Sequence, residues 1–292
     1  MRVVYRSMKY KEKKYQEAFM MKKIDIALAQ LICEDGKAEN NLARLDHVVD
    51  EYGQSHDLIL FPETFIAGFP PPEVCRTLAE PLDGPIVKHL ERKAREADTS
   101  IVVGLYEKEG ENIYNTTVLV GPAGLLLSYR KVHLFPGEEK AVKAGNCFRS
   151  CNWQGTKVGL LICYDIEYPE TARAVASMGT ELLLVTDGNW EGPVHRVAVQ
   201  ARAQENQMFV ALTNRLGQLE DEDITFCGES VIVDPYGRII AEAGREEEVL
   251  SASLDLSLIQ ESKQQYDYLK ERRVPLNIPS KEIEKGVWEI KI

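Results

Sequence analysis

A cysteine between a predicted strand and a predicted helix is the first candidate for chemistry in this sequence. The apolar run 158–162 is typical of a buried strand, Cys163 follows it, and a helix is expected from Pro169. A nucleophile at such a strand end sits where the backbone turns and N–H groups can point at an oxyanion. A cysteine after an apolar strand is equally typical of a small buried side chain. This segment alone leaves both interpretations open.

A thiol with an ordinary pKa of about 8.5 needs a base or a cation beside it to react at neutral pH. Glu63 is a candidate base, because it follows the apolar run 58–61 and Pro62, and burial would raise its pKa. A carboxylate in the first turn of a helix is the commoner interpretation of this position.

A lysine ends a third predicted strand. Lys131 closes the second strand of a predicted hairpin, where a solvated lysine at a sheet edge is the usual explanation.

His133 and His195 offer another possibility for the base, since an unrelated thiol enzyme could use either of them.

Strand-like and helical runs alternate along the chain, which predicts a layered α/β sandwich. The turn at 121–124 predicts an antiparallel hairpin over 114–133, so the sheets are expected to be mixed. Other strands are expected over 24–31, 58–61, 100–106, 158–163, 182–186, 208–213, 229–233 and 248–254, and helices over 40–52, 86–97, 169–178 and 197–206.

One domain is expected over residues 22–275, because no linker or repeat divides this stretch. Residues 1–21 are basic without the apolar core of a secretory signal, and they are expected to form a flexible N-terminal extension. Residues 276–292 are expected to form a C-terminal tail, within an irregular stretch that begins near Tyr266.

Composition argues against several classes of partner. The net charge of −11 disfavours nucleic-acid binding, and no apolar run approaches the length of a membrane span. The six cysteines show no CxxC pairing, and the five histidines do not cluster around them. We therefore expect reduced thiols in the cytoplasm, and neither a metal nor a cofactor.

The three candidates and their flanking residues together resemble the nitrilase superfamily of carbon–nitrogen hydrolases, in its amidase-like branch. The resemblance covers roughly residues 22–275 and implies a four-layer α-β-β-α sandwich with mixed sheets. The matching segments are Phe61-Pro62-Glu63, Tyr129-Arg130-Lys131, Leu161-Ile162-Cys163-Tyr164-Asp165, Ala201-Arg202-Ala203, Asn214-Arg215 and Asp234-Pro235-Tyr236-Gly237.

The resemblance also implies catalytic roles. Cys163 would form a thioester, Glu63 would move the protons, and Lys131 would stabilise the oxyanion together with the backbone N–H of Tyr164. A second glutamate usually follows the lysine and orients it. Glu138 fits that spacing without a gap, and Glu139 fits if the loop shifts by one residue.

Substrate contacts are less defined by the sequence. Tyr164 follows the cysteine, and Asn189 and Trp190 follow the predicted strand 182–186, where they could form a pocket wall or a solvated loop. The pair Tyr164-Asp165 resembles hydrolases acting on amides, whereas nitrilases more often carry Trp-Glu after the cysteine.

The expected reaction is therefore hydrolysis of a small amide with water, releasing ammonia or an amine. The alternatives are an N-carbamoyl amide hydrolase, a nitrilase, or a catalytically silent binding member of the superfamily. A homodimer or a larger homo-oligomer is expected, because members of the superfamily commonly pair.

Overall fold

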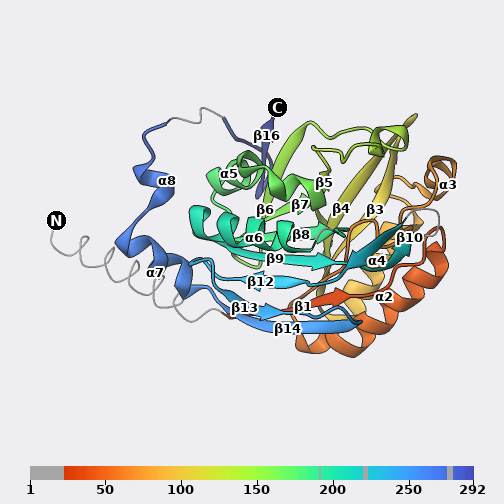
Figure 1. Cartoon of the computed structure of the whole chain (residues 1–292), viewed down its shortest axis with the longest axis horizontal. Coiled ribbons are helices and arrows are strands. Elements are labelled where there is room, and N and C mark those ends of the chain that lie inside the picture. The colour runs from red at the N-terminus through yellow and green to blue at the C-terminus, as the bar shows by residue number, and fades with distance from the viewer. Residues whose placement is uncertain (1–22, 191, 220–222, 275–278) are drawn as a thin grey trace.

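Two β-sheets lie face to face, with helices on their outer sides (Figure 1). The structure, a computed structural model, describes residues 23–190, 192–219, 223–274 and 279–292. The predicted N-terminal extension lies outside these residues. Within them, no helix is both long and apolar enough to span a membrane.

The first sheet is mixed, as the sequence predicts. Its first three strands along the chain run parallel, and the hairpin β4–β5 and the strand β14 pair with them in antiparallel fashion. In spatial order it contains β14 (Glu248–Asp255), β1 (Lys23–Gln30), β2 (Leu58–Leu60), β3 (Ser100–Glu109), β4 (Asn112–Gly121) and β5 (Gly124–Arg130).

The second sheet is larger and also mixed. It contains, in order, β13 (Ile239–Glu242), β12 (Val231–Val233), β9 (Phe209–Asn214), β8 (Leu182–Asp187), β7 (Thr156–Ile162), β6 (Cys147–Trp153), β16 (Val287–Lys291) and β15 (Lys281–Glu284). Its central strands β7, β8 and β9 are parallel. A separate two-stranded ribbon pairs β10 (Leu216–Leu219) with β11 (Ile224–Cys227).

Helices cover the outer face of each sheet (Figure 1). The α-helices are α2 (Ala38–Tyr52), α3 (Pro72–Leu78), α4 (Pro85–Ala97), α5 (Pro169–Ser177), α6 (Pro193–Asn206), α7 (Ser257–Gln265) and α8 (Tyr268–Glu271). Short 3₁₀ turns are η1 (Gly53–Ser55), η2 (Glu138–Lys140) and η3 (Cys163–Glu167). α2 and α4 pack on the first sheet, and α5 and α6 pack on the second. The expected four-layer α-β-β-α sandwich is confirmed.

Apolar side chains from the two sheets share one core. Leu28 and Leu60 of the first sheet belong to the same buried cluster as Leu160 and Leu184 of the second. Two polar contacts also cross the interface between the sheets: the hydroxyls of Thr117 and Thr186 lie 2.6 Å apart, and the indole N–H of Trp153 donates to the Ser100 hydroxyl at 2.8 Å. The sheets are therefore fixed relative to each other.

The C-terminal residues differ from the prediction. The stretch after Tyr266, expected to be irregular, contains α8 and the hairpin β15–β16, and β16 pairs antiparallel with β6. β6 and the ribbon β10–β11 were not predicted either. These strands lack the long apolar runs that mark the central strands.

The segment after β2 crosses the first sheet at very close range. Phe61 N–H donates to the Val102 carbonyl at 2.8 Å, and Gly104 N–H donates to the Pro62 carbonyl at 3.3 Å. A Cβ at Gly104 would lie 2.2 Å from the backbone nitrogen of Thr64 and 2.8 Å from the carbonyl carbon of Glu63. Only glycine on β3 allows the backbone that carries Glu63 to lie there.

Gly104→Ala is expected to lower the free energy of unfolding by about 1–3 kcal/mol, because the added methyl group meets backbone atoms that cannot rotate away. Gly244→Ala is the matched control. Its Cβ would meet only Glu248 Oε1 at 3.8 Å, so a change within about 0.5 kcal/mol is expected. Urea denaturation measures both; equal stabilities for the two variants would contradict the close approach.

Candidate active site

Cys163 opens the 3₁₀ turn η3 directly after β7, as the sequence predicts for a residue at a strand end. Its backbone φ is 45°, in the left-handed region that non-glycine residues rarely adopt. The residue is buried, with 7% of its surface exposed. Strained backbone of this kind recurs at functional sites, where the surrounding structure maintains it.

Two carboxylates hold the ammonium group of Lys131. The lysine Nζ lies 2.9 Å from Glu63 Oε1 and 2.7 Å from Glu138 Oε2, and both the lysine and Glu63 are 1% exposed. Glu63 follows β2, Lys131 follows β5, and Glu138 begins η2. Glu139 instead accepts from the backbone N–H of Gly137 at the surface. Of the two glutamates that fit the sequence spacing, Glu138 is therefore the one that contacts the lysine.

A residue that the sequence did not single out completes this cluster. The amide nitrogen of Asn115 on β4 donates to Glu63 Oε1 at 2.6 Å and to Glu138 Oε1 at 3.3 Å. Oε1 of Glu63 thus accepts two hydrogen bonds, whereas its Oε2 is buried and has no hydrogen-bond partner among the described residues. One oxygen of this carboxylate is held in place, and the other is free to accept a proton.

Burial and charge shift the ionisation of all three central groups. Burial raises the pKa of Glu63, the Lys131 ammonium opposes that rise, and Glu138 adds to it. Burial alone would lower the pKa of Lys131, but the charges of Glu63 and Glu138 raise it well above its usual value. The lysine is therefore held in its charged form.

The thiol is protonated in the resting site. Burial and the neighbouring Glu63 carboxylate raise the pKa of Cys163 well above its usual value, while the Lys131 ammonium and the Gly188 backbone lower it. A Cβ at Gly188 would lie 3.0 Å from Glu63 Oε2. Gly188 therefore adjoins both the thiol sulfur and the unpartnered carboxylate oxygen.

Asp165 links the cysteine segment to the lysine segment. Its buried carboxylate accepts from the Tyr129 hydroxyl at 2.8 Å, and from the backbone N–H of His133 at 2.9 Å. The His133 ring nitrogen Nδ1 lies 2.9 Å from the same carboxylate. These contacts fix the residues on either side of Lys131 relative to η3.

His195 lies close to the thiol in a second ion-pair network. Its Nδ1 is 2.9 Å from Asp187 Oδ2, and its Nε2 is 3.1 Å from Glu167 Oε1. Burial would lower the pKa of this imidazole, but Asp187 and Glu167 raise it to about 9. The ring is therefore cationic at neutral pH.

A sulfur, a carboxylate oxygen and a ring nitrogen from Cys163, Asp187 and His195 lie within 4.8 Å of one another, a spacing that a metal ion could bridge. Both imidazole nitrogens already contact carboxylates. His195 and Asp187 therefore form an ion pair beside the thiol.

The three residues predicted to contact substrate differ in their surroundings. Tyr164 and Trp190 are half-buried, and both pack edge-on against Phe135, with ring centroids 5.4 and 5.0 Å away. Asn189 is buried, and its backbone exchanges hydrogen bonds with the Asn214 side chain at 2.9 Å. Tyr164 and Trp190 thus share one aromatic wall, and Asn189 has backbone contacts that fix the loop after β8.

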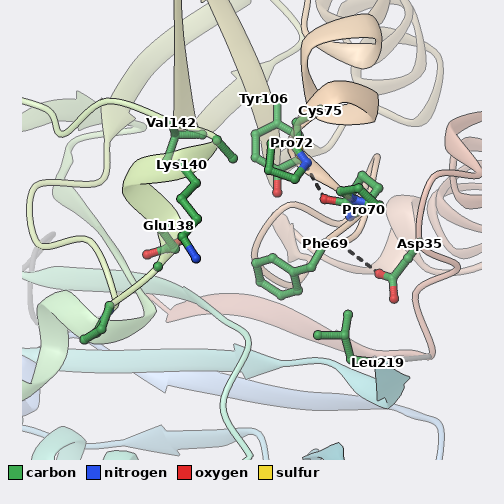
Figure 2. A pocket seen from close by; sticks show the side chains of 14 residues that line it. Asp35, Phe69, Pro70, Pro72, Cys75, Tyr106, Glu138, Lys140, Val142 and Leu219 are labelled. Atoms are coloured by element: carbon green, nitrogen blue, oxygen red, sulfur yellow. Dashed lines mark hydrogen bonds between the residues drawn. The ribbon is translucent and has the colours of Figure 1, made fainter. Parts of the chain in front are cut away.

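A cavity of about 520 Å³ lies on the Glu138 side of the site. Figure 2 shows Glu138 and Lys140 on one side of it, facing Phe69 and the proline segment that precedes α3. Tyr106 also lines the cavity. The lining is largely apolar, and its charged residues are Glu138, Lys140 and Asp35.

Comparison with known proteins gives a consistent result. Residues 25–264 match the family model described as "Carbon-nitrogen hydrolase". An "(R)-stereoselective amidase" from Pseudomonas sp is 43% identical over 269 residues, which cover 91% of this chain and 98% of that protein.

Solved structures agree. Nit3 from Saccharomyces cerevisiae, described as a member of branch 10 of the nitrilase superfamily, is 28% identical, covers 88% of this chain and 98% of its own, and has a TM-score of 0.80. A mutant amidase from Nesterenkonia sp. AN1, which carries acrylamide added at its active-site cysteine, is 30% identical, covers 86% and 96%, and has a TM-score of 0.75.

With this fold and this buried cluster of acids, lysine and thiol, the chain belongs to the carbon–nitrogen hydrolase family of the nitrilase superfamily. Within that family it is an amidohydrolase that acts through a cysteine. The family, the fold and the type of reaction expected from the sequence are confirmed.

Replacing Glu138 is expected to lower kcat for amide hydrolysis on the order of 10–10²-fold, because Glu138→Gln removes a charge 2.7 Å from Lys131 Nζ and lets the ammonium shift. Glu139→Gln is the control one residue away, and it should retain the wild-type rate. Steady-state kinetics on one amide substrate compares the two. Equal losses, or a larger loss at Glu139, would contradict the assignment.

Proposed function

We propose that this enzyme hydrolyses a small amide through a thioester on Cys163, with Glu63 as the proton-transfer group and Lys131 as an oxyanion donor. The observation that carries this proposal is the arrangement of the Glu63 carboxylate. One oxygen is fixed by Lys131 and Asn115, while the other is buried beside Gly188 and has no hydrogen-bond partner among the described residues.

In the first half-reaction, Glu63 takes the proton of the Cys163 thiol as the sulfur bonds to the substrate carbonyl carbon. The carbonyl electron pair moves to oxygen and forms a tetrahedral intermediate. When this intermediate collapses, the carbon–nitrogen bond breaks and the nitrogen leaves with the proton from Glu63. Ammonia or an amine departs, and the acyl group stays on sulfur.

In the second half-reaction, Glu63 takes a proton from water while the water oxygen attacks the thioester carbon. Collapse of this intermediate breaks the carbon–sulfur bond, and the proton on Glu63 returns to the sulfur. A carboxylic acid leaves, and the thiol is restored. The raised pKa of Glu63 suits a group that must both accept and release a proton.

Lys131 is not the base in this proposal. Two carboxylates keep it charged, so its role is to donate to the oxygen on which negative charge develops. The backbone N–H of Tyr164, the residue after the nucleophile, is proposed as a second donor. Glu138, together with Glu63, positions the Lys131 ammonium.

Substrate contacts are proposed for Tyr164, Trp190 and Asn189. The aromatic wall made by Tyr164, Trp190 and Phe135 supports an acyl group with apolar surface. All six cysteines, each among the described residues, are free thiols. Free thiols support the proposal that the enzyme works in the reducing environment of the cytoplasm.

Glu63→Gln tests the proton-transfer role. The glutamine side chain cannot accept the thiol proton, so kcat for a primary amide is expected to fall by about 10²–10⁴-fold. Ammonia release measures this rate, and Glu139→Gln is the control, because it makes the same exchange at a carboxylate that accepts from the Gly137 backbone N–H at the surface. Near-normal turnover in Glu63→Gln would refute the assignment.

The thioester itself is tested by intact-mass measurement during turnover of a slow amide. The acyl mass is expected on the wild-type chain and absent from Cys163→Ala. The same assay with nitriles and N-carbamoyl amino acids compares substrate classes. An adduct on Cys163→Ala would contradict the proposed nucleophile.

We also propose that the enzyme forms a homodimer through the outer face of α6. Val194 and Val197, three residues apart on this helix, expose 42% and 64% of their surfaces. Light scattering should give a mass of two chains for the wild type and one chain for Val197→Glu. A monomeric wild type would refute this proposal.

A further inference from the structure

A second charged network, separate from Glu63, Lys131 and Glu138, lies beside the nucleophile. It consists of Asp187 at the end of β8, His195 in the first turn of α6 and Glu167 at the end of η3. Asp187 is fully buried and His195 is 4% exposed. The proposed proton transfers do not use any of these three residues.

The Asp187 carboxylate is close enough to act on the thiol. Oxygen, sulfur and ring nitrogen of Asp187, Cys163 and His195 all lie within 4.8 Å of one another. A buried negative charge at that range opposes formation of a thiolate, because both anions would share a poorly solvated site. A cation paired with Asp187 removes much of this opposition.

His195 supplies that cation, and each of its two ring nitrogens contacts a carboxylate. Nδ1 contacts both oxygens of Asp187, at 3.0 and 2.9 Å, while Nε2 reaches Glu167 Oε1. With a carboxylate acceptor at each nitrogen, both nitrogens must carry hydrogen to satisfy the contacts. The imidazolium form fits this geometry, and it leaves no nitrogen lone pair to receive the thiol proton.

Asp187 also holds the backbone around the nucleophile. Asp187 Oδ1 accepts from the Gly188 backbone N–H at 3.0 Å, and the Asp187 carbonyl accepts from the Glu63 backbone N–H at 3.2 Å. The Gly188 backbone also lowers the pKa of the Cys163 thiol. The orientation of Asp187 therefore bears on both the proposed nucleophile and the proposed base.

We propose that His195 is a positioning residue for the thiol, whose positive charge neutralises Asp187 and so permits the thiolate of Cys163 to form. This inference rests on the proposed function in one respect, that Cys163 is the nucleophile. It assigns His195 a role opposite to that of a general base: the ring acts by keeping its protons.

The charged groups facing His195 come from three elements. Asp187 lies at the end of β8, and Glu167 and Cys163 belong to η3. On its own helix, Arg202 binds the carbonyls of Ile166 and Glu167 and so holds η3 against α6. The charge of Asp187 in turn raises the pKa of the Glu63 carboxyl and the pKa of the Cys227 thiol.

The sign of the pH effect follows from these contacts. Below pH ~9 the imidazolium balances Asp187; as pH rises through about 9 the ring loses its proton, and the Asp187 charge then acts unopposed on the thiol. Replacing His195 with a neutral residue should produce that unbalanced state at neutral pH.

The test measures the alkylation rate of Cys163 by iodoacetamide between pH 5 and 10, read from the mass of the peptide that contains it. His195→Gln is expected to raise the apparent pKa of the thiol by about one unit, which makes alkylation at pH 7 about tenfold slower. Asp187→Asn should shift it the other way and speed alkylation at pH 6. The double variant His195→Gln/Asp187→Asn should recover at least the wild-type rate.

Glu205→Gln is the matched control. It removes a carboxylate from the same helix, where Glu205 pairs with Arg202 and not with His195, and it should leave the alkylation profile unchanged. Thermal unfolding of each variant identifies any loss of folding. If His195→Gln does not fold, Asp187→Asn and the double variant still test the charge balance.

Two results would overturn the inference. Slower alkylation in Asp187→Asn would mean that His195 acts as a base oriented by its aspartate. A double variant as slow as His195→Gln would mean that the ring matters for packing and not for charge. Because alkylation needs no substrate and no turnover, these outcomes are separate from a failure of the thioester test, which would refute Cys163 itself.

Discussion

The buried ammonium of Lys131 is the interaction on which the site depends. An uncompensated charge at this depth would be very costly, so the two carboxylates from separate elements are required for the lysine to be there at all. The same contacts hold one oxygen of Glu63 and leave the other free. Charge compensation of Lys131 and the orientation of the Glu63 carboxylate are thus produced by one set of contacts.

The two sheets bring these groups together because the relevant strands end at the same edge of the sandwich. Glu63 follows a strand of the first sheet and Cys163 a strand of the second, and the Glu63 N–H bonds to the carbonyl at the end of β8. Glycine at 104 and 188 lets backbone and side chains approach where a methyl group would collide. The packing of the sheets therefore fixes the separation of acid and thiol.

The sequence was sufficient to predict that Glu63, Lys131 and Cys163 follow strands, because each comes after an apolar run, and the structure has them there; their catalytic roles are proposed from the motifs. It could not identify Asn115, because this polar residue lies inside a strand and its hydrogen-bond partner Glu63 is distant in the sequence. Asp187 also follows an apolar run, but its pairing with His195 depends on the turn at the start of α6. The hairpin β15–β16 was missed because charged residues dominate its first strand.

That hairpin determines how the larger sheet ends. β16 covers β6, and β15 then forms the outermost strand, where Lys281, Glu282 and Glu284 are all exposed. A short, charged edge strand discourages backbone pairing with a strand of another molecule. The final residues of the described chain thus protect the sheet that carries Cys163 against edge-to-edge aggregation.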